Sequence, residues 1–233
     1  MVAALILMIV IGIPLGVIAA RYAGRWPDHL VRLVYLSGWA TPTFLAGFLL
    51  VIFVAPVFGL PTTGDLSQVP PPYHEWTHIS VLDALLAGNL PAAWDAFLHL
   101  FLPALALAFV TLGIATRMTR TSMLEVLPMD YVKTARMKGL AETRVVYGHA
   151  LRNSLITTTT VLGITAGTLL AGTVVIENIF SWPGIGEYAY KSITSANYAG
   201  IIGTTVVFAI GVVVANMIAD IVYGLLDPRV EWR

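Results

Sequence analysis

Long runs without a charged residue recur along this chain and limit what it can fold into. Within the 233 residues they cover positions 1–20, 33–64, 100–116, 153–176 and 192–219. A helix needs about 20 mostly apolar residues to cross a lipid bilayer. Lipid admits only helices or closed barrels, because the backbone must satisfy its own hydrogen bonds there, and these runs lack the polar–apolar alternation of barrels. The sequence therefore predicts an all-α, polytopic membrane protein. Its transmembrane helices are expected at about 1–20, 31–58, 98–123, 152–176 and 199–225.

The thirteen Lys and Arg residues are distributed unevenly between the connections that join these helices. The connections at 59–97 and 177–198 contain only Lys191, and the others lie in the first connection, around the third and after the last helix. Basic connections stay in the cytoplasm by the positive-inside rule. The pattern predicts an external N-terminus, a cytoplasmic C-terminus and two extracytoplasmic loops. The formal net charge is zero, so nucleic acid is not an expected partner.

The cytoplasmic connection at about 124–151 has the features of a short capped helix. Asp130 is a good N-cap for a helix that starts at Tyr131, and Lys138 in the last turn suits the helix dipole. Gly139 can then adopt the left-handed conformation that ends a helix. Two interpretations follow from the residues alone: a docking element for another protein, or a basic loop that fixes topology and touches anionic lipid.

One long segment, DYVKTARMKGLAETRVVYGHALRNSL, resembles the cytoplasmic loop of binding-protein-dependent ABC transporter permeases, in the dipeptide, oligopeptide and nickel branch. The general loop pattern is Glu-Ala-Ala, three residues, Gly, nine residues, Ile, one residue, Leu-Pro. The residues that match it are Ala135, Gly139 and Leu151. The departures are Lys133, Thr134, His149 and Arg152, although DYVxTARxKGL is the form typical of the peptide branch.

The resemblance extends over essentially the whole chain. GVIAARYAGRWPDHLVRLVYLSGWATPTFLAGFLL, HLFLPALALAFVTLGIATRMTRTSMLEVL, ENIFSWPGIGEYAYKSI and IADIVYGLLDPRV are similar to family segments in the same order. Only the family's first helix and the extracytoplasmic stretch after it have no counterpart. The first predicted helix also begins at Met1 without a basic residue before it, so we expect that a preceding helix is missing.

The resemblance implies the transmembrane subunit of an ATP-driven importer in the cell inner membrane. Such a subunit moves peptides or a related small polar solute into the cytoplasm by alternating access and is not an enzyme. The implied partners are two cytoplasmic ABC ATPases, a homologous permease subunit, identical or different, an extracytoplasmic solute-binding protein and membrane lipid. The chain lacks a GxxxxGK[ST] phosphate loop. We therefore expect no cofactor on this chain, with ATP used by the partners.

In this family the short loop helix docks in a groove of the ATPase and acts as a lever. The small Ala135 and Gly139 are expected to permit close approach. The resemblance assigns ATPase coupling to Asp130, Tyr131, Thr134, Ala135, Arg136, Lys138, Gly139 and Leu140.

Both extracytoplasmic loops are candidates for contact with the binding protein. In the loop 177–198 the expected contact is the turn formed by Trp182, Pro183 and Gly184. In the loop 59–97 we expect one or two short helices at the membrane interface, where tryptophan is favoured.

Two other classes of function remain open on the residues alone. His74, Glu75 and His78 spell HExxH, the signature of a membrane zinc metalloprotease. The motif requires a helix, and the three prolines before it allow a helix to start only late. It also requires a third zinc ligand, for which Asp83 and His99 are the candidates. An ion-coupled secondary transporter is the other alternative, but its usual mark, charge at the centre of a membrane helix, is not expected here.

Overall fold

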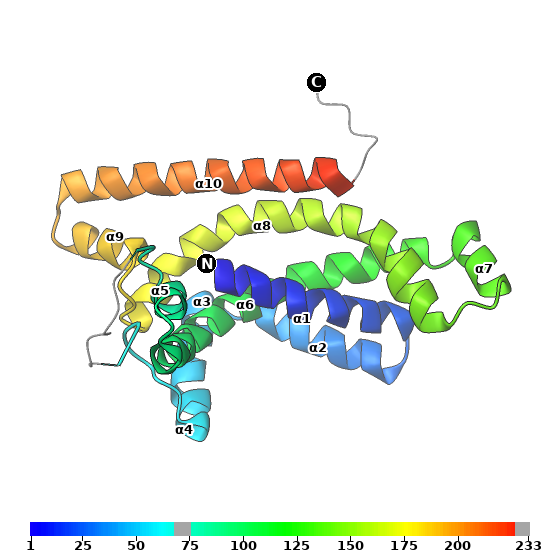
Figure 1. The fold of residues 1–233 in the computed structure, drawn as a ribbon, viewed down its shortest axis with the longest axis horizontal. Coiled ribbons are helices and arrows are strands. Elements are labelled where there is room, and N and C mark those ends of the chain that lie inside the picture. Colours follow the sequence, from blue (N-terminus) through cyan, green and yellow to red (C-terminus); the bar gives the residue numbers. More distant parts are fainter. Residues whose placement is uncertain (68–75, 227–233) are drawn as a thin grey trace.

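The structure is a computed structural model that describes residues 1–67 and 76–226. Every regular element in this part of the chain is helical. The long helices of the bundle in Figure 1 are α1 (Val2–Arg21), α2 (Trp26–Ala40), α6 (Leu90–Val126), α8 (Leu151–Ile179) and α10 (Tyr198–Leu226). Shorter elements connect them: α3 (Thr43–Leu49), a π-helical stretch (Leu50–Val54), α4 (Ala55–Phe58), α5 (Ser80–Leu86), α7 (Asp130–Met137), a second π-helical stretch (Arg144–Ala150) and α9 (Ile185–Thr194).

The prediction of an all-α, polytopic membrane protein is confirmed. Among the described residues, α1, α6 and the Tyr198–Ile218 part of α10 are each long and apolar enough to cross a membrane. The pair formed by α2 and Thr43–Phe58 passes the same test as a bent span. Helix α8 has 29 residues, about 44 Å at 1.5 Å per residue, and packs between α6 and α10. Length and composition thus support three or four spans where the sequence predicts five.

The second predicted helix, 31–58, is broken in the structure. Helix α2 starts earlier, at Trp26, and ends at Ala40, and the following segment leaves it at an angle of 111°. Pro42 explains the break, because it lacks a backbone N–H and forces the preceding residue out of the helical region. Thr41 accordingly has extended backbone angles, φ −87° and ψ 122°.

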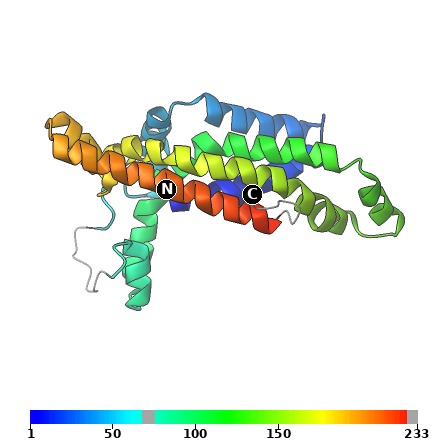
Figure 2. The same ribbon diagram turned by 90° about the horizontal axis from the view of Figure 1, so that it is seen from above.

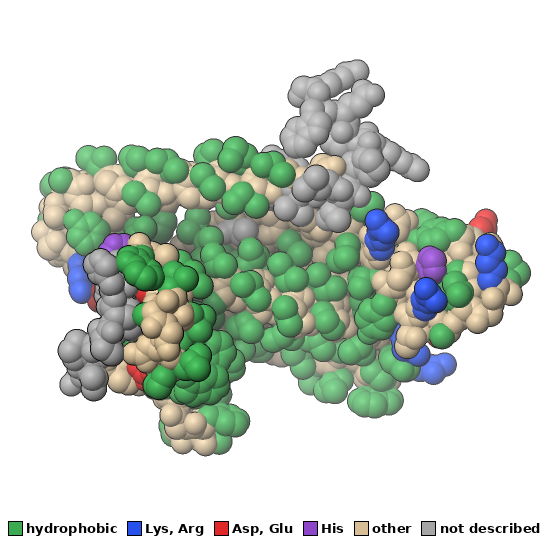
Figure 3. All heavy atoms as spheres, viewed as in Figure 1, with side chains coloured by type: hydrophobic (Ala, Val, Ile, Leu, Met, Phe, Trp, Pro, Cys, Tyr) green, Lys and Arg blue, Asp and Glu red, His purple; other side chains and the backbone are tan. Residues whose placement is uncertain are grey.

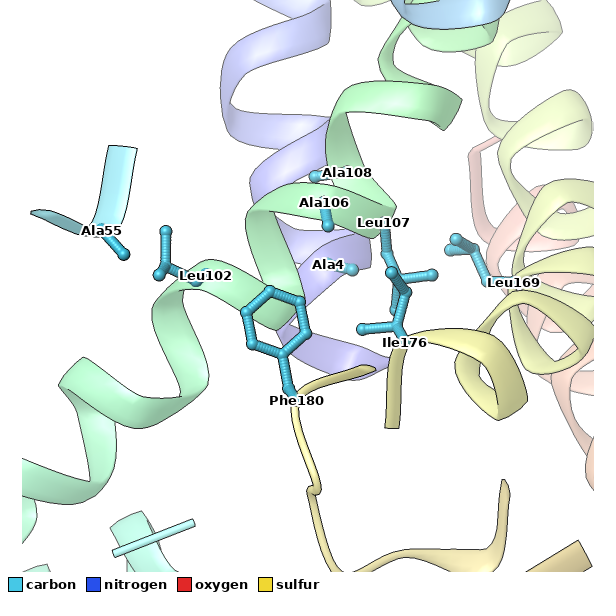
Figure 4. Packing of buried hydrophobic residues seen from close by; sticks show 9 residues of the cluster. All are labelled: Ala4, Ala55, Leu102, Ala106, Leu107, Ala108, Leu169, Ile176 and Phe180. Atoms are coloured by element: carbon cyan, nitrogen blue, oxygen red, sulfur yellow. The ribbon is translucent and has the colours of Figure 1, made fainter. Parts of the chain in front are cut away.

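Helix α6 is the central element of the bundle and packs against α1, α2, α3 and α8. One buried cluster, shown in Figure 4, joins Leu102 and Leu107 of α6 to Ile176 and Phe180 at the end of α8. Helix α10 packs on the outside of α8 and exposes large apolar side chains along its length. In lipid such exposure costs little, since lipid tails are as apolar as these side chains.

Glycines allow the helices around α6 to approach it closely. A Cβ on Gly16 of α1 would lie 2.6 Å from Thr119 Cβ and 2.7 Å from the backbone oxygen of Thr116. A Cβ on Gly38 of α2 would overlap the backbone oxygen of Phe109. Small residues permit such backbone contact between membrane helices.

The first part of α6 starts eight residues before the predicted boundary of 98 and belongs to a separate arm. Figure 2 shows this part, together with α5, running across the bundle rather than along it. Two aspartates hold the arm together. Asp83 accepts hydrogen bonds from the N and Oγ1 of Thr77 (2.8 and 2.7 Å), and Asp95 accepts two from Ser67 (both 2.7 Å). Of the one or two short helices predicted in the loop 59–97, α5 is present, whereas residues 90–97 form the first part of the long α6.

Candidate docking site at the basic end of the bundle

Helix α7 projects beyond one end of the bundle, at the right in Figure 1. Lys and Arg side chains gather at this end in Figure 3, which we call the basic end. The turn between α1 and α2, with its arginines, lies toward the same end in both ribbon views. The structure therefore brings together basic residues that are separated in the sequence.

The start of α7 differs in detail from the sequence expectation. Its N-cap is Met129, and Asp130 is the first helical residue and makes no cap hydrogen bond through its side chain. The Asp130 carboxylate instead accepts a hydrogen bond from Lys133 Nζ at 2.9 Å. This contact lowers the pKa of Asp130 below its usual range. A carboxylate in the first turn still suits the helix dipole.

The end of α7 follows the sequence prediction closely. Gly139 has a φ of 76°, the left-handed conformation that was expected to stop the helix. Its backbone N–H donates to the oxygen of Arg136 at 2.9 Å, and nothing lies within 4 Å of where a Cβ would be. The glycine is thus required by the backbone and leaves an open surface beside it.

The inner face of α7 is packed against its own chain. Val132 is fully buried and Ala135 is 7% exposed, in a cluster with Val145, Val146 and Met123. The expectation that Ala135 permits close approach of an ATPase therefore needs correction. Ala135 faces the same side as Val132, three residues earlier, and that side is the chain's own core.

The outer face of α7 carries the residues that a partner could reach. Met137 is 80% exposed, and Tyr131 is 40% exposed, with its hydroxyl 3.2 Å from Asn153 Nδ2. Thr134 and Lys138 are exposed as well. The sequence argument missed Met137. It could have been found as the apolar residue of this helix that does not share a side with Val132 and Ala135. Exposed methionine is typical of adaptable binding surfaces.

Arg136 is engaged within the loop rather than free. Its Nη2 and Nε donate to the two carboxylate oxygens of Glu142 at 3.0 and 3.2 Å. Bidentate pairs of this kind fix geometry as well as charge. The pair closes the loop that follows α7, so Arg136 fixes the shape of this loop from within the chain.

The Arg136–Glu142 pair makes the stability of the loop depend on pH. The hydrogen bond from Arg136 lowers the pKa of Glu142, so its stabilisation is complete above the ordinary glutamate pKa of about 4.3. It is lost as the pH falls through the lowered, folded-state pKa. Because both side chains are more than 40% exposed, we expect Glu142→Gln to cost at most about 1 kcal/mol at pH 7 and less at pH 3. Thermal unfolding of the wild type and of Glu142→Gln in detergent, at pH 7 and at pH 3, measures this difference in stability. An equal difference at the two pH values would contradict the prediction.

The outer turn expected to contact a binding protein lies at the opposite end of the bundle, beside α9. Glu177 holds this turn, because its Oε2 accepts hydrogen bonds from the N–H groups of Gly186 and Glu187 at 2.7 and 3.1 Å. A Cβ on Gly184 would overlap the Glu177 carboxylate. Trp182 is half-buried beside Glu177, and Pro183 is exposed.

The HExxH motif gains no support from the residues around it. His74 and Glu75 lie outside the described residues, while His78 has a φ of 56°. Asp83 accepts bonds from Thr77, and His99 Nδ1 lies 2.9 Å from the backbone oxygen of Asp95. Within residues 1–67 and 76–226, no three His, Cys, Asp or Glu side chains come together as possible metal ligands.

A buried ion pair near the basic end was not expected from the sequence, which placed Arg120 close to the cytoplasmic end of the predicted helix 98–123. Arg120 lies within α6, and its Nε and Nη2 donate to Asp28 at 2.8 and 2.9 Å. Asp28 is fully buried and also accepts from the backbone N–H of Gly24 at 3.0 Å. The pair ties the α1–α2 turn to the helix that leads into α7. Arg32, four residues after Asp28 on the same helix, adds a local contact from its Nε to Asp28 at 3.3 Å.

Comparison with known proteins gives one consistent family. The model of the binding-protein-dependent transport system inner membrane component matches residues 12–232. The probable D,D-dipeptide transport system permease protein DdpB of Escherichia coli is 43% identical, over 97% of this chain and 67% of that protein. The dipeptide transport system permease protein DppB of Haemophilus influenzae is 41% identical, over 94% and 66%. The oligopeptide transport system permease protein AppB of Bacillus subtilis is 36% identical, over 97% and 66%.

The chain spans about two thirds of the length of these relatives. Among solved structures, a chain of the inward-facing MetNI methionine ABC transporter matches with a TM-score of 0.68 and 15% identity, over 96% of this chain and 89% of that one. At this identity the likeness concerns the fold alone. The chain belongs to the family of inner membrane components of binding-protein-dependent transport systems.

Proposed function

We propose that this chain is a transmembrane permease subunit of an ATP-driven importer for dipeptides or oligopeptides. The support is its membership of a transport family and its identity of 36–43% with proteins named as peptide permeases. A protease or a proton-coupled carrier would belong to a different family. Nickel, the other solute of this branch, has no support among these relatives.

The observation that carries the mechanism is the construction of α7. Its inner face is fixed to α6 and to the second π-helical stretch by Val132 and Ala135, and its outer face is open. A force applied to the outer face would therefore reach the end of α6 without being lost in a flexible loop. By the positive-inside rule the basic end is cytoplasmic, where two ABC ATPases would bind, hydrolyse ATP and move α7 as a lever.

The coupling residues then divide into two groups by their surroundings. Asp130, Tyr131, Thr134, Lys138 and Gly139 are exposed and would contact the ATPase together with Met137. Ala135, Arg136 and Leu140 would position that surface from within. A homologous permease, identical or different, would complete the path, and a solute-binding protein would meet the turn Trp182–Gly184 outside.

The docking role of α7 is tested by Gly139→Leu with a matched control. Leucine in the left-handed region costs roughly 1–2 kcal/mol and places a bulky side chain on the proposed contact surface. Gly24, in the α1–α2 turn, has nearly the same φ of 75° and equally open surroundings, so Gly24→Leu imposes the same strain away from α7. We expect co-purification of the ATPase in mild detergent to fall at least about tenfold for Gly139→Leu, the effect of losing a central interface contact, and to persist for Gly24→Leu. Equal recovery with both variants would contradict docking at α7.

A further inference from the structure

A cavity of about 240 Å³ opens on the outer surface of the bundle between α2 and α6. One charged side chain contributes to it, Arg117, which lies within α6 and near the cytoplasmic end of the predicted helix 98–123. The lining residues are Trp39, Gly113, Ile114, Arg117, Met118 and Thr121.

The Arg117 guanidinium has an aromatic neighbour and a free polar edge. Its central carbon lies 5.8 Å from the centroid of the Trp39 ring, a cation–π contact. Among the residues that the structure describes, no Asp or Glu pairs with Arg117, whereas the nearby Arg120 holds Asp28. Arg117 is therefore an exposed cation whose hydrogen-bond donors point to no carboxylate in the described part of its own chain.

The depth of this cavity in the bundle makes an exposed arginine unusual. A Cβ on Gly113 would lie 3.4 Å from Trp39 Cβ, so α2 and α6 meet closely beside the cavity. Arg117 lies nine residues before the end of α6 at Val126, about 14 Å along the helix axis. A charged side chain facing lipid so far from the helix end is strongly disfavoured, and such residues normally line water-filled paths.

We propose that Arg117 and Trp39 form a binding site for the carboxylate of the transported peptide, on a water-filled path along this face of α6. The inference rests on the proposed peptide importer. A guanidinium binds carboxylate through two parallel hydrogen bonds, Trp39 holds the guanidinium plane, and the Thr121 hydroxyl, one turn along α6, offers a further donor. Ile114 and Met118 supply the apolar wall for the adjoining side chain of the peptide.

The site can be tested by thiol chemistry, because this chain contains no cysteine. Arg117→Cys is made in the transporter, assembled with partner subunits whose own cysteines are replaced by serine, and reconstituted in liposomes. The thiol is treated either with 2-aminoethyl methanethiosulfonate, which adds an ammonium group, or with 2-sulfonatoethyl methanethiosulfonate, which adds an anion. ATP-dependent uptake of alanyl-alanine is then measured, with Arg25→Cys, at the start of α2 and outside the cavity, as the control.

We expect uptake by Arg117→Cys to fall about tenfold or more, the scale of a lost hydrogen bond between charged groups. The ammonium reagent should restore most of it and the anionic reagent none, while Arg25→Cys should respond to neither. Alanyl-alanine should also slow the reaction of the introduced thiol in Arg117→Cys. A thiol that does not react, rescue by both reagents, or protection by anionic phospholipid but not by peptide would overturn the proposal.

The proposed function and this site can fail separately. If the wild-type transporter takes up no peptide, the importer assignment fails. If it takes up peptide while Arg117→Cys does so equally well, the importer stands and the carboxylate site is wrong.

Discussion

Replacing Gly16 with leucine is expected to prevent α1 from packing on α6 and to abolish recovery of folded protein. Even the first added carbon would lie 2.6 Å from Thr119 Cβ and 2.7 Å from a backbone oxygen, and a backbone atom cannot move aside as a flexible side chain can. Overpacking in a core typically costs about 1–3 kcal/mol. A leucine at this crossing should exceed that range, because the helices themselves must separate.

The control for this variant is Gly203→Leu in α10. Gly203 is also a helical glycine, but nothing lies within 4 Å of its Cβ position. Size-exclusion chromatography in detergent measures the monodisperse fraction of each variant. We expect near wild-type recovery for Gly203→Leu and almost none for Gly16→Leu. Normal recovery of Gly16→Leu would mean that α1 does not contact α6 as described.

Asp28→Asn is expected to be the most destabilising change that preserves side-chain shape. Asp28 is fully buried and receives two hydrogen bonds from Arg120. Removing its charge leaves the Arg120 guanidinium without a counter-ion, which costs about 3 kcal/mol or more for a buried pair. Adding Arg120→Gln should recover part of that loss, since the unpaired charge is then gone as well.

The matched control is Asp130→Asn, which breaks the Asp130–Lys133 pair at the surface of α7. Exposed pairs contribute little, so this variant should unfold like the wild type. Thermal unfolding in detergent, followed by circular dichroism, compares the two. If both variants shifted the midpoint equally, the Asp28–Arg120 pair would not be a buried structural link.

Periodicity and local turn chemistry predicted the parts of the fold that depend on neighbouring residues only. The left-handed Gly139 and the end of α7 follow from the sequence, because helix termination is local. The sequence predicted one continuous helix over 31–58, because the 111° angle after Ala40 depends on how the following segment packs against α6 and α8. Arg117 lay within the predicted helix 98–123, but charge counting grouped it with the cytoplasmic connection, because a count along the sequence gives no depth in the bundle.

The candidate docking site shows the same limit. The family resemblance assigned ATPase coupling to eight residues in and beside α7, but it could not show which side of the helix faces inward. Ala135 was expected on the contact surface and is buried, while Met137 was overlooked and is the most exposed large apolar side chain in the described part of the chain. The different exposure of Ala135 and Met137 becomes visible only from the packing of α7 on Val145 and Val146.

The central claim, that α7 is where an ATPase acts on this chain, is tested most directly by photo-crosslinking from Met137. The photoreactive residue p-benzoylphenylalanine replaces Met137 in one variant and Tyr190, at the opposite end of the bundle, in another, and the adducts are identified by mass spectrometry. We expect a covalent adduct with a P-loop ATPase from position 137 and none from position 190. Lipid adducts alone at position 137, in preparations where the ATPase co-purifies, would contradict the account.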